Sequence, residues 1–295
     1  MSKIHEALKR AEQERNNPGV SPGPEGQHPG GESQAASANS AAVAPEEFAA
    51  RCAKKDWDPN QRTMLFFGDE ERVGMEEFRV LRSRLYQMQE RTGLKTLLVT
   101  SALPREGKSF MAANLAQVLV HRNGRKVLLI DGDLRAPRLH VDLGASGEPG
   151  LSELLSGEKD EFDVTQRGPL EGLFVIPAGR RRKNPAELVS NGQLKGLFTR
   201  LGGFFDWIVV DSPPLLVSDT VIMAAYCDGV IMVIRSGMTP FDVVRKARRE
   251  LDERPLVGTI LNGVDPDQSP YTHYYYSYYS SARKHGHQEP SKVAS

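Results

Sequence analysis

Six apolar segments, each five to seven residues long, recur between residues 96 and 262 and most constrain the fold of this chain. Stretches with helical patterns separate them, notably residues 219–226 and 240–253. Runs of Val, Ile and Leu that alternate with helices predict an α/β fold, in which helices bury a parallel sheet on both faces. The segments are TLLVTS (96–101), KVLLID (126–131), LFVIPA (173–178), WIVVD (207–211), GVIMVIR (229–235) and LVGTILN (256–262).

Composition divides the chain into regions. Residues 16–58 are rich in Pro, Gly, Ser, Ala and Asn. A segment of this kind buries too little apolar surface to offset its chain entropy, so we expect a disordered linker. A compact domain is predicted over residues 60–265, opening with a helix at about 74–91. The polar residues 266–295 lack regular periodicity and form a predicted tail.

The first 15 residues have the apolar spacing of a short amphipathic helix. Ile4, Ala7, Leu8 and Ala11 fall at i, i+3, i+4 and i+7. Such a helix is too short to be stable alone in water. It is either a docking element that folds on a partner or a frayed terminus.

Charge and cysteine content exclude several classes of protein. The formal net charge is zero, which gives no reason to expect bulk binding to nucleic acid. Cys52 and Cys227 are the only cysteines, which fits a reducing cytosol.

No apolar run approaches the roughly 20 residues of a membrane span, so membrane association is expected only through a partner. Two short basic runs, residues 180–183 and 245–249, are interpreted as a solvated loop and helix face.

The segment ALPREGKS (102–109) matches the phosphate-binding pattern [GA]xxxxGK[ST]. It follows a predicted strand and opens a helix, so backbone N–H groups of residues 104–109 are expected to face phosphates. Lys108 is expected on the β and γ phosphates and Ser109 on Mg²⁺. The predicted nucleotide contacts in this segment are Pro104, Arg105, Glu106, Gly107, Lys108, Ser109 and Phe110.

Acidic residues end two of the apolar segments. LLIDGDLR (128–135) carries Asp131 and Asp133, and IVVDSPP (208–214) carries Asp211. Carboxylates beside a phosphate loop predict a Mg²⁺ site, because Mg²⁺ prefers oxygen ligands. One carboxylate must also accept the proton of an incoming hydroxyl, and Asp131 or Asp133 is placed for that. The alternative for Asp133 is that it only caps a turn.

Six tyrosines crowd the segment YTHYYYSYY (271–279), and no apolar residue interrupts them to supply a core. A tyrosine hydroxyl has a pKa near 10, so it needs a carboxylate base to attack at neutral pH. Tyr271, the first tyrosine, lies seven residues beyond Val264, a reach of roughly 25 Å at full extension. The segment is either an acceptor for phosphoryl transfer or an aromatic binding surface. The tyrosines are Tyr271, Tyr274, Tyr275, Tyr276, Tyr278 and Tyr279.

Together, ALPREGKS, LLIDGDLR and IVVDSPP resemble the three signature motifs of the bacterial tyrosine kinases over roughly residues 70–280. The resemblance implies a P-loop NTPase-type sheet and an ATP-dependent, Mg²⁺-dependent protein-tyrosine kinase. It implies metal contacts for Ser109, Asp131 and Asp211, with Asp131 as the base and Asp133 beside it. Arg135 is implied in the active-site network. Arg105 departs from the family pattern, in which glycine is more usual.

Two further features take a meaning from the same resemblance. Asn262 resembles the position that contacts adenine in this family, although a turn-forming Asn before Gly263 is an equal alternative. Glu76, Arg79 and Arg82 form an ExxRxxR pattern within about a third of a helix circumference. It is either a solvated face or, as in the family, an interface that closes a ring of subunits.

The family implies autophosphorylation of the tyrosine tail, in trans within an oligomer, and control of exopolysaccharide or capsule synthesis and export. Implied partners are a membrane-embedded polysaccharide co-polymerase that activates the kinase and a tyrosine phosphatase. The chain is therefore expected in the cytoplasm, peripheral to the inner membrane. Two alternatives are an ATP-switched positioning ATPase, which the DxDxR motif argues against, and a pseudokinase scaffold, which Arg105 keeps open.

Overall fold

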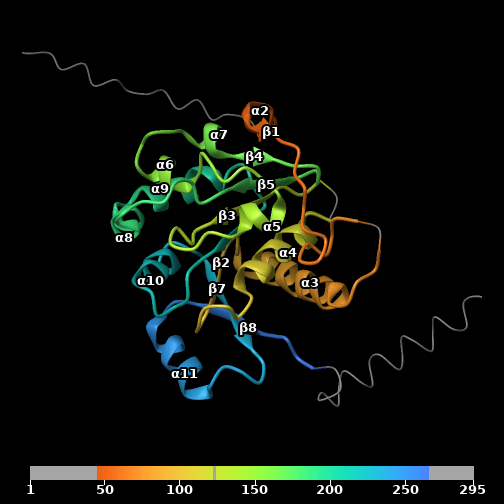
Figure 1. The fold of residues 1–295 in the computed structure, drawn as a ribbon, viewed down its shortest axis with the longest axis vertical. Helices are drawn as coiled ribbons and strands as arrows, with labels where there is room; N and C mark the ends of the chain where they lie inside the picture. The colour runs from red at the N-terminus through yellow and green to blue at the C-terminus, as the bar shows by residue number, and fades with distance from the viewer. Residues whose placement is uncertain (1–44, 69, 122–123, 266–295) are drawn as a thin grey trace, which may run out of the picture. The chain divides into compact units, whose positions relative to one another are not determined.

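An eight-stranded sheet forms the centre of the computed structural model, which describes residues 45–68, 70–121 and 124–265 (Figure 1). The strand order is β1-β4-β5-β3-β6-β2-β7-β8. The strands are β1 (Ala53–Lys54), β2 (Thr96–Ser101), β3 (Val127–Asp131), β4 (Gln166–Arg167), β5 (Leu173–Ile176), β6 (Trp207–Asp211), β7 (Gly229–Arg235) and β8 (Leu256–Asn262). The six longer strands are the six predicted segments, and they pair in parallel. Only the short β4 pairs antiparallel, with β5.

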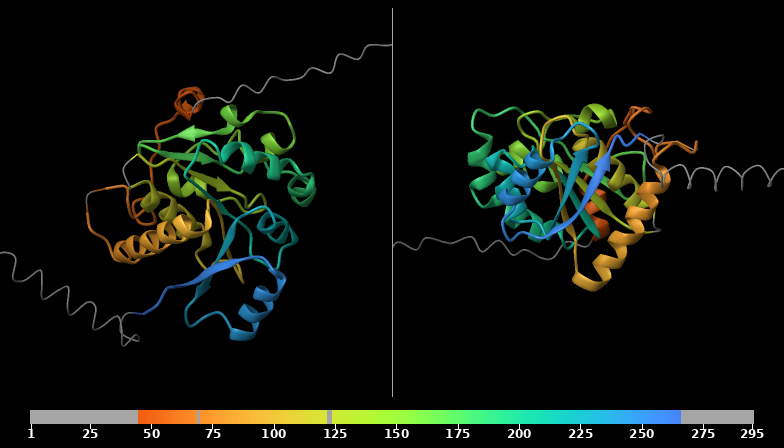
Figure 2. Two further views of the ribbon diagram at one scale, coloured as in Figure 1. Left: turned by 180° about the vertical axis from the view of Figure 1, so that it is seen from behind. Right: turned by 90° about the horizontal axis from the view of Figure 1, so that it is seen from below.

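Helices cover both faces of the sheet, as predicted. Leu97 and Val99 of β2 point into one core with α3, α4 and α5, whereas Leu98 points into the other, with α6, α8, α9, α10 and α11. Figures 1 and 2 show α3 and α4 on one side of the strands and α8 to α10 on the other. The helices are α2 (Pro45–Arg51), α3 (Met75–Thr92), α4 (Lys108–Val120), α5 (Leu139–Leu143), α6 (Leu151–Leu155), α7 (Glu161–Val164), α8 (Pro185–Ser190), α9 (Gln193–Leu201), α10 (Ser218–Ala224) and α11 (Phe241–Glu250).

Residues 45–58 correct the predicted linker, because they are folded onto the domain. Phe48 of α2 is buried, and its ring stacks on Phe204 at 4.4 Å. Trp57 lies so close to Gly168 that a Cβ there would meet the indole ring at 2.1 Å. Two aromatic side chains in a polar stretch thus supply enough burial to order it. The predicted helix over residues 1–15, the linker up to residue 44 and the tail over residues 266–295 lie outside the described residues.

The parallel strands bring the predicted polar motifs to one edge of the sheet. Asp131 and Asp211 end β3 and β6 and are register partners across these neighbouring strands. The loop that leads from β2 into α4 starts at the same edge, because β2 pairs with β6 on one side and β7 on the other. Ligands of open α/β sheets bind at this edge. In the described part of the chain, no helix is both long and apolar enough to cross a membrane.

Candidate active site

The phosphate loop joins β2 to α4 and contains two residues with positive φ, Arg105 and Gly107. Gly107 adopts φ +93° and caps the start of α4, whose first N–H groups have no acceptor within the helix. Arg105 is exposed and adopts φ +66°, a left-handed conformation that costs a non-glycine residue about 1–2 kcal/mol. This explains physically why glycine suits that position. Pro104 has no N–H, so the expected donors to phosphate start at residue 105.

The carboxylate of Glu106 stabilises the phosphate loop through hydrogen bonds within the protein rather than facing a ligand. The side chain is buried and accepts hydrogen bonds from the N–H of Leu103 (2.7 Å), the N–H of Arg235 (3.3 Å) and the Thr239 hydroxyl. It therefore ties the loop to the end of β7. Phe110, on the first turn of α4, packs against Phe78 of α3, with ring centroids 6.1 Å apart.

Asn262, at the end of β8, contacts the phosphate loop directly. Its amide donates to the carbonyl oxygen of Glu106 at 2.8 Å. A Cβ on Gly107 would approach the same amide nitrogen to 2.1 Å, so only glycine leaves room for Asn262. The structure thus places Asn262 at the nucleotide loop, as a residue that positions the loop; its predicted contact with adenine stays a prediction.

Lys108 and Asp133 form an ion pair of 3.1 Å between Nζ and Oδ2, and both side chains are largely buried. Asp133 also accepts the N–H of Ala136 at 3.0 Å, so it caps a turn and faces the phosphate loop at once. Asp131 is fully buried and accepts the N–H groups of Asp133, Arg138 and Leu139 at 3.1–3.2 Å. Burial raises the pKa of Asp131 to about 6, although these N–H groups oppose the effect.

Asp211 is the site residue best suited to a cation. It is fully buried, and neither carboxylate oxygen has a partner with hydrogen-bond geometry in the described residues. Burial raises the pKa of Asp211 to about 8, while Lys108 and the nearby Ser109 hydroxyl lower it. Buried, unpartnered oxygens beside a serine hydroxyl fit a divalent cation. The described residues contain no group of three or more His, Cys, Asp or Glu side chains arranged to hold a metal ion.

Arg135 lies in the loop that follows β3, as Asp133 does, and it pairs with a residue that the sequence did not indicate. Its guanidinium makes two hydrogen bonds, of 2.8 and 3.0 Å, to the buried carboxylate of Asp219 in the first turn of α10. The loop after β3 is therefore fastened to α10. Asp219 follows a serine at a helix start, which in sequence looks like a capping position and carries no sign of this pairing.

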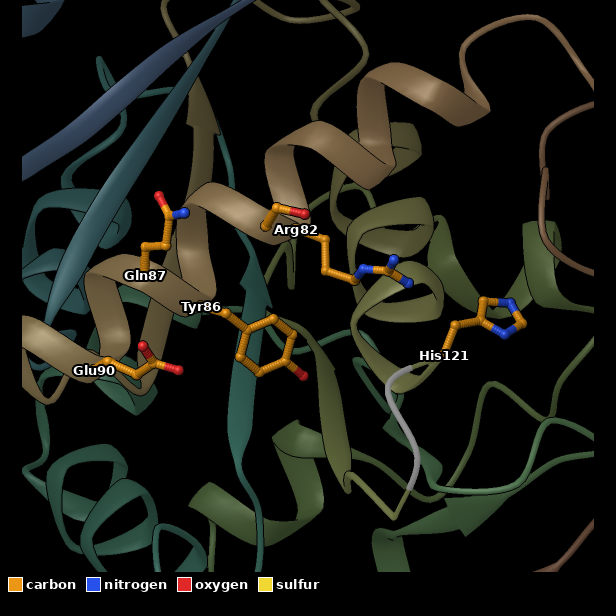
Figure 3. A pocket seen from close by; sticks show the side chains of 6 residues that line it. Arg82, Tyr86, Gln87, Glu90 and His121 are labelled. Atoms are coloured by element: carbon orange, nitrogen blue, oxygen red, sulfur yellow. The ribbon is translucent and has the colours of Figure 1, made fainter.

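The ExxRxxR residues lie on α3. Arg79 pairs within the chain, with Glu71 at 2.6 Å and Glu76 at 3.1 Å. Arg82 donates to the carbonyl of Val118 and extends toward the end of α4, where His121 lies (Figure 3). Arg82 and His121 line a pocket of about 430 Å³ on this surface, together with Ser83, Tyr86, Gln87 and Glu90. Glu76, Arg79 and Arg82 thus lie together on α3, away from the strand ends that carry the predicted active-site residues. The six tail tyrosines lie outside the described residues.

The chain is similar in sequence and fold to known tyrosine-protein kinases. The chain is 33% identical to the tyrosine-protein kinase YwqD of Bacillus subtilis over 224 residues, which cover 75% of this chain and 92% of YwqD. It is 34% identical to EpsB of Ralstonia solanacearum but spans only 26% of that protein's length. The kinase domain of the Escherichia coli tyrosine kinase ETK superposes with a TM-score of 0.61 at 34% identity, over 64% of this chain and 75% of that one.

No protein-family model matches the chain. The resemblance to YwqD nevertheless extends over 92% of that kinase, and the kinase domain of ETK shares the fold at 34% identity. The chain therefore belongs to the bacterial tyrosine kinase family.

Proposed function

We propose that this chain is an ATP-dependent protein-tyrosine autokinase whose acceptors are the tyrosines of residues 271–279, phosphorylated in trans within an oligomer. The observation that carries the proposal is the convergence of Lys108, Asp131, Asp133 and Asp211 at the strand edge where β8 also ends. The first tyrosine follows Asn262 by nine residues. A neighbour's tail is within reach of such a site.

In the proposed reaction the tyrosine oxygen attacks the γ-phosphorus of ATP, the bond to the β,γ-bridging oxygen breaks, and ADP leaves. Lys108 exchanges its partner Asp133 for the phosphates, which carry more negative charge. Ser109, Asp211 and Asp131 would hold Mg²⁺, which would neutralise negative charge on the phosphates. The loop N–H groups from residue 105 onward bind the phosphate oxygens.

Asp131 is proposed as the base that takes the tyrosine proton. Its pKa, raised by burial to about 6, leaves it ionised at neutral pH yet more basic than an ordinary aspartate. Asp133 is the alternative, because release of Lys108 onto the phosphates would free its carboxylate. Substituting each with asparagine separates the two, provided that ATP binding is measured for both variants. The base variant keeps ATP binding and loses transfer.

Assembly and location form the second part of the proposal. We place the oligomer interface on α3, at Glu76, Arg79 and Arg82, because the side chains of Glu76 and Arg79 are partly exposed and Arg82 lines a surface pocket. A membrane-embedded polysaccharide co-polymerase would recruit and activate the chain at the inner membrane, and a tyrosine phosphatase would reverse the modification. The regulated process is exopolysaccharide or capsule synthesis and export. Size measurements on Glu76→Ala/Arg82→Ala, beside Glu77→Ala on the same helix, test the interface.

The central experiment is intact-mass analysis and phosphopeptide mapping after incubation with Mg-ATP, beside a Lys108→Ala control. We expect phosphate on tyrosines of residues 271–279 that disappears in the control. Mixing Lys108→Ala with a chain whose six tail tyrosines are phenylalanine tests transfer in trans, since phosphate can then appear only on the Lys108→Ala chain. ATP-dependent dimers without phosphotyrosine, even with the membrane partner added, would instead indicate a positioning ATPase.

A further inference from the structure

A second, strongly basic pocket lies beside the active-site loop. It encloses about 280 Å³ between the loop that follows β3 and the segment that leads from β5 into α8. We call it the basic pocket, because each of its charged lining residues is positive. Its lining residues are Leu134, Arg135, Arg181, Arg182, Lys183 and Pro185.

Two of the four cations in the basic pocket are already neutralised. Arg135 pairs with Asp219, and Arg182 pairs with Glu158 at 2.7 Å. Arg181 donates one N–H to the carbonyl of Arg135 at 2.8 Å, but neither it nor Lys183 forms an ion pair within the described ranges. Both side chains belong to exposed residues. The pocket therefore keeps about two positive charges for a ligand.

The segment that carries these cations is held in place by a buried carboxylate. Glu153 accepts the N–H of Gly150 at 2.7 Å and the N–H of Arg180 at 3.0 Å. Burial raises the pKa of Glu153, but these N–H groups outweigh it, and the net pKa lies below the ordinary value. A Cβ on Gly179 would meet Glu153 Oε2 at 2.2 Å, so the backbone packs directly against the carboxylate. The pocket is thus formed before any ligand arrives.

The pocket adjoins the reacting groups through a short stretch of chain. Arg135 lies two residues from Asp133, which pairs with Lys108, and two residues span at most about 7 Å. A ligand in the basic pocket therefore lies next to the site of phosphoryl transfer. Tyrosines in residues 271–279 are one to three residues apart, up to about 11 Å when extended.

We propose that the basic pocket binds a phosphotyrosine in the 271–279 segment of a second copy and so retains that segment for further transfers; this rests on the proposed function. A phosphotyrosine carries about −1.5 to −2 charges, which matches the two unpaired cations. The buried side chains of Leu134 and Pro185 offer apolar contact for its ring. Residues 271–280 contain no Asp or Glu, so the unphosphorylated segment has no charge to attract.

Fluorescence anisotropy tests the proposal without any transfer reaction. The probe is a labelled peptide of residues 269–281, unphosphorylated or phosphorylated at Tyr274, added to the full chain without nucleotide after phosphatase treatment. We expect the phosphorylated peptide to bind at least about 10-fold more tightly, since charge-assisted hydrogen bonds supply the difference. Arg181→Ala/Lys183→Ala should abolish this preference. Arg245→Ala/Arg249→Ala removes the same charge from the exposed face of α11 and should keep it.

Three results would overturn the proposal. One is equal affinity for the two peptides, and another is full phosphopeptide binding by Arg181→Ala/Lys183→Ala. The third is equally tight binding of the peptide with Glu at the phosphotyrosine position, which would show a general attraction for acidic segments. Because no transfer is involved, these results decide the pocket even if the chain proves not to be an autokinase.

A second readout uses Mg-ATP and intact mass. At equal total phosphate, the wild-type chain should show multiply phosphorylated and unmodified chains together, because a captured tail is modified again. Arg181→Ala/Lys183→Ala should accumulate singly phosphorylated chains first. Identical distributions in the two proteins would contradict retention by the pocket, whereas no phosphate in either would count against the proposed function alone.

Discussion

The side-chain amide of Asn262 donates a 2.8 Å hydrogen bond to the carbonyl oxygen of Glu106, which joins the last residue of β8 to the phosphate loop. Glu106 in turn binds the end of β7 through its carboxylate. The edge strand β8 and its neighbour β7 thus hold the loop that receives ATP. Asn262 is also the last residue of the sheet before the chain continues toward its tyrosine segment, so the end of β8 contacts the phosphate loop.

Asn262→Ala should weaken ATP binding. The substitution removes the hydrogen bond to Glu106 and leaves the carbonyl without that donor, a loss of about 1 kcal/mol, or about 5-fold in affinity. Titration with a fluorescent ATP analogue measures the effect. Leu261→Ala is the matched control, because Leu261 is a neighbouring residue of β8 with an exposed side chain. Unchanged affinity in Asn262→Ala would show that β8 does not position the loop.

Substitutions of Arg105 should weaken ATP binding, and glycine should leave the protein more stable than alanine does. Arg105→Ala and Arg105→Gly both remove an exposed guanidinium beside the phosphate site, so both should bind ATP about 3- to 10-fold more weakly. Only glycine accepts φ +66° without strain. Arg105→Gly should therefore melt about 2–4 °C above Arg105→Ala, for a difference of about 1 kcal/mol. Tighter ATP binding in either variant would show that the side chain obstructs the phosphates.

The sequence predicted the parts of this fold that rest on local patterns. Buried parallel strands are continuous apolar runs, so all six long strands could be recognised, and with them the edge where Asp131 and Asp211 meet. The two-residue strands β1 and β4 have no such pattern. Phe48 and Trp57 gave no signal within polar surroundings, although both pack on the domain.

Side-chain pairing over long sequence separation was the harder part of the site. Arg135 and Asp219 are 84 residues apart, and nothing near either one marks the pair. The two interpretations of Asp133, an active-site acid and a turn cap, proved compatible, because its two oxygens serve Lys108 and Ala136 separately. Residues 180–183 form a largely exposed loop, as the sequence predicted, but the sequence did not show that Arg181, Arg182 and Lys183 also line a pocket.

Asp211→Asn should stabilise the nucleotide-free protein at alkaline pH. Burial raises the pKa of Asp211 from 3.8 to about 8, so the folded state keeps a proton that the unfolded state has lost. That stabilising contribution is complete below about pH 4 and is lost as pH rises through about 8. Asparagine has no proton to lose, so its protein should melt above wild type at pH 9, by about 2–4 °C per kcal/mol.

Melting curves between pH 5 and pH 9, with and without Mg-ATP, measure both sides of this effect. Mg-ATP should raise the melting temperature of the wild type and leave Asp211→Asn nearly unchanged, because the neutral amide is a poor ligand for the cation. Asp206→Asn is a control of equal charge change at a carboxylate that pairs with Arg125 at the other end of β6. A lower melting temperature of Asp211→Asn at pH 9 would mean that Asp211 is ionised and stabilising there.

His121 should report on assembly at α3. Burial, then the charges of Arg82 and Arg79, lower its pKa below 6.5. The unfolded state therefore binds the proton more readily, so this histidine contributes stability above about pH 6.5 that is lost as pH falls. Arg82→Gln should raise the pKa of His121, as followed by the imidazole NMR resonance and assigned with His121→Gln. Arg84→Gln, an exposed residue of the same helix, should not.

The same resonance tests whether Arg82 meets a neighbouring subunit. If a partner's carboxylate neutralises Arg82 in an oligomer, the pKa of His121 should rise as protein concentration increases, and Arg82→Gln should remove that dependence. A pKa that stays constant while the protein assembles would place the interface elsewhere. The pocket that Arg82 and His121 share would then be a surface left open in the oligomer.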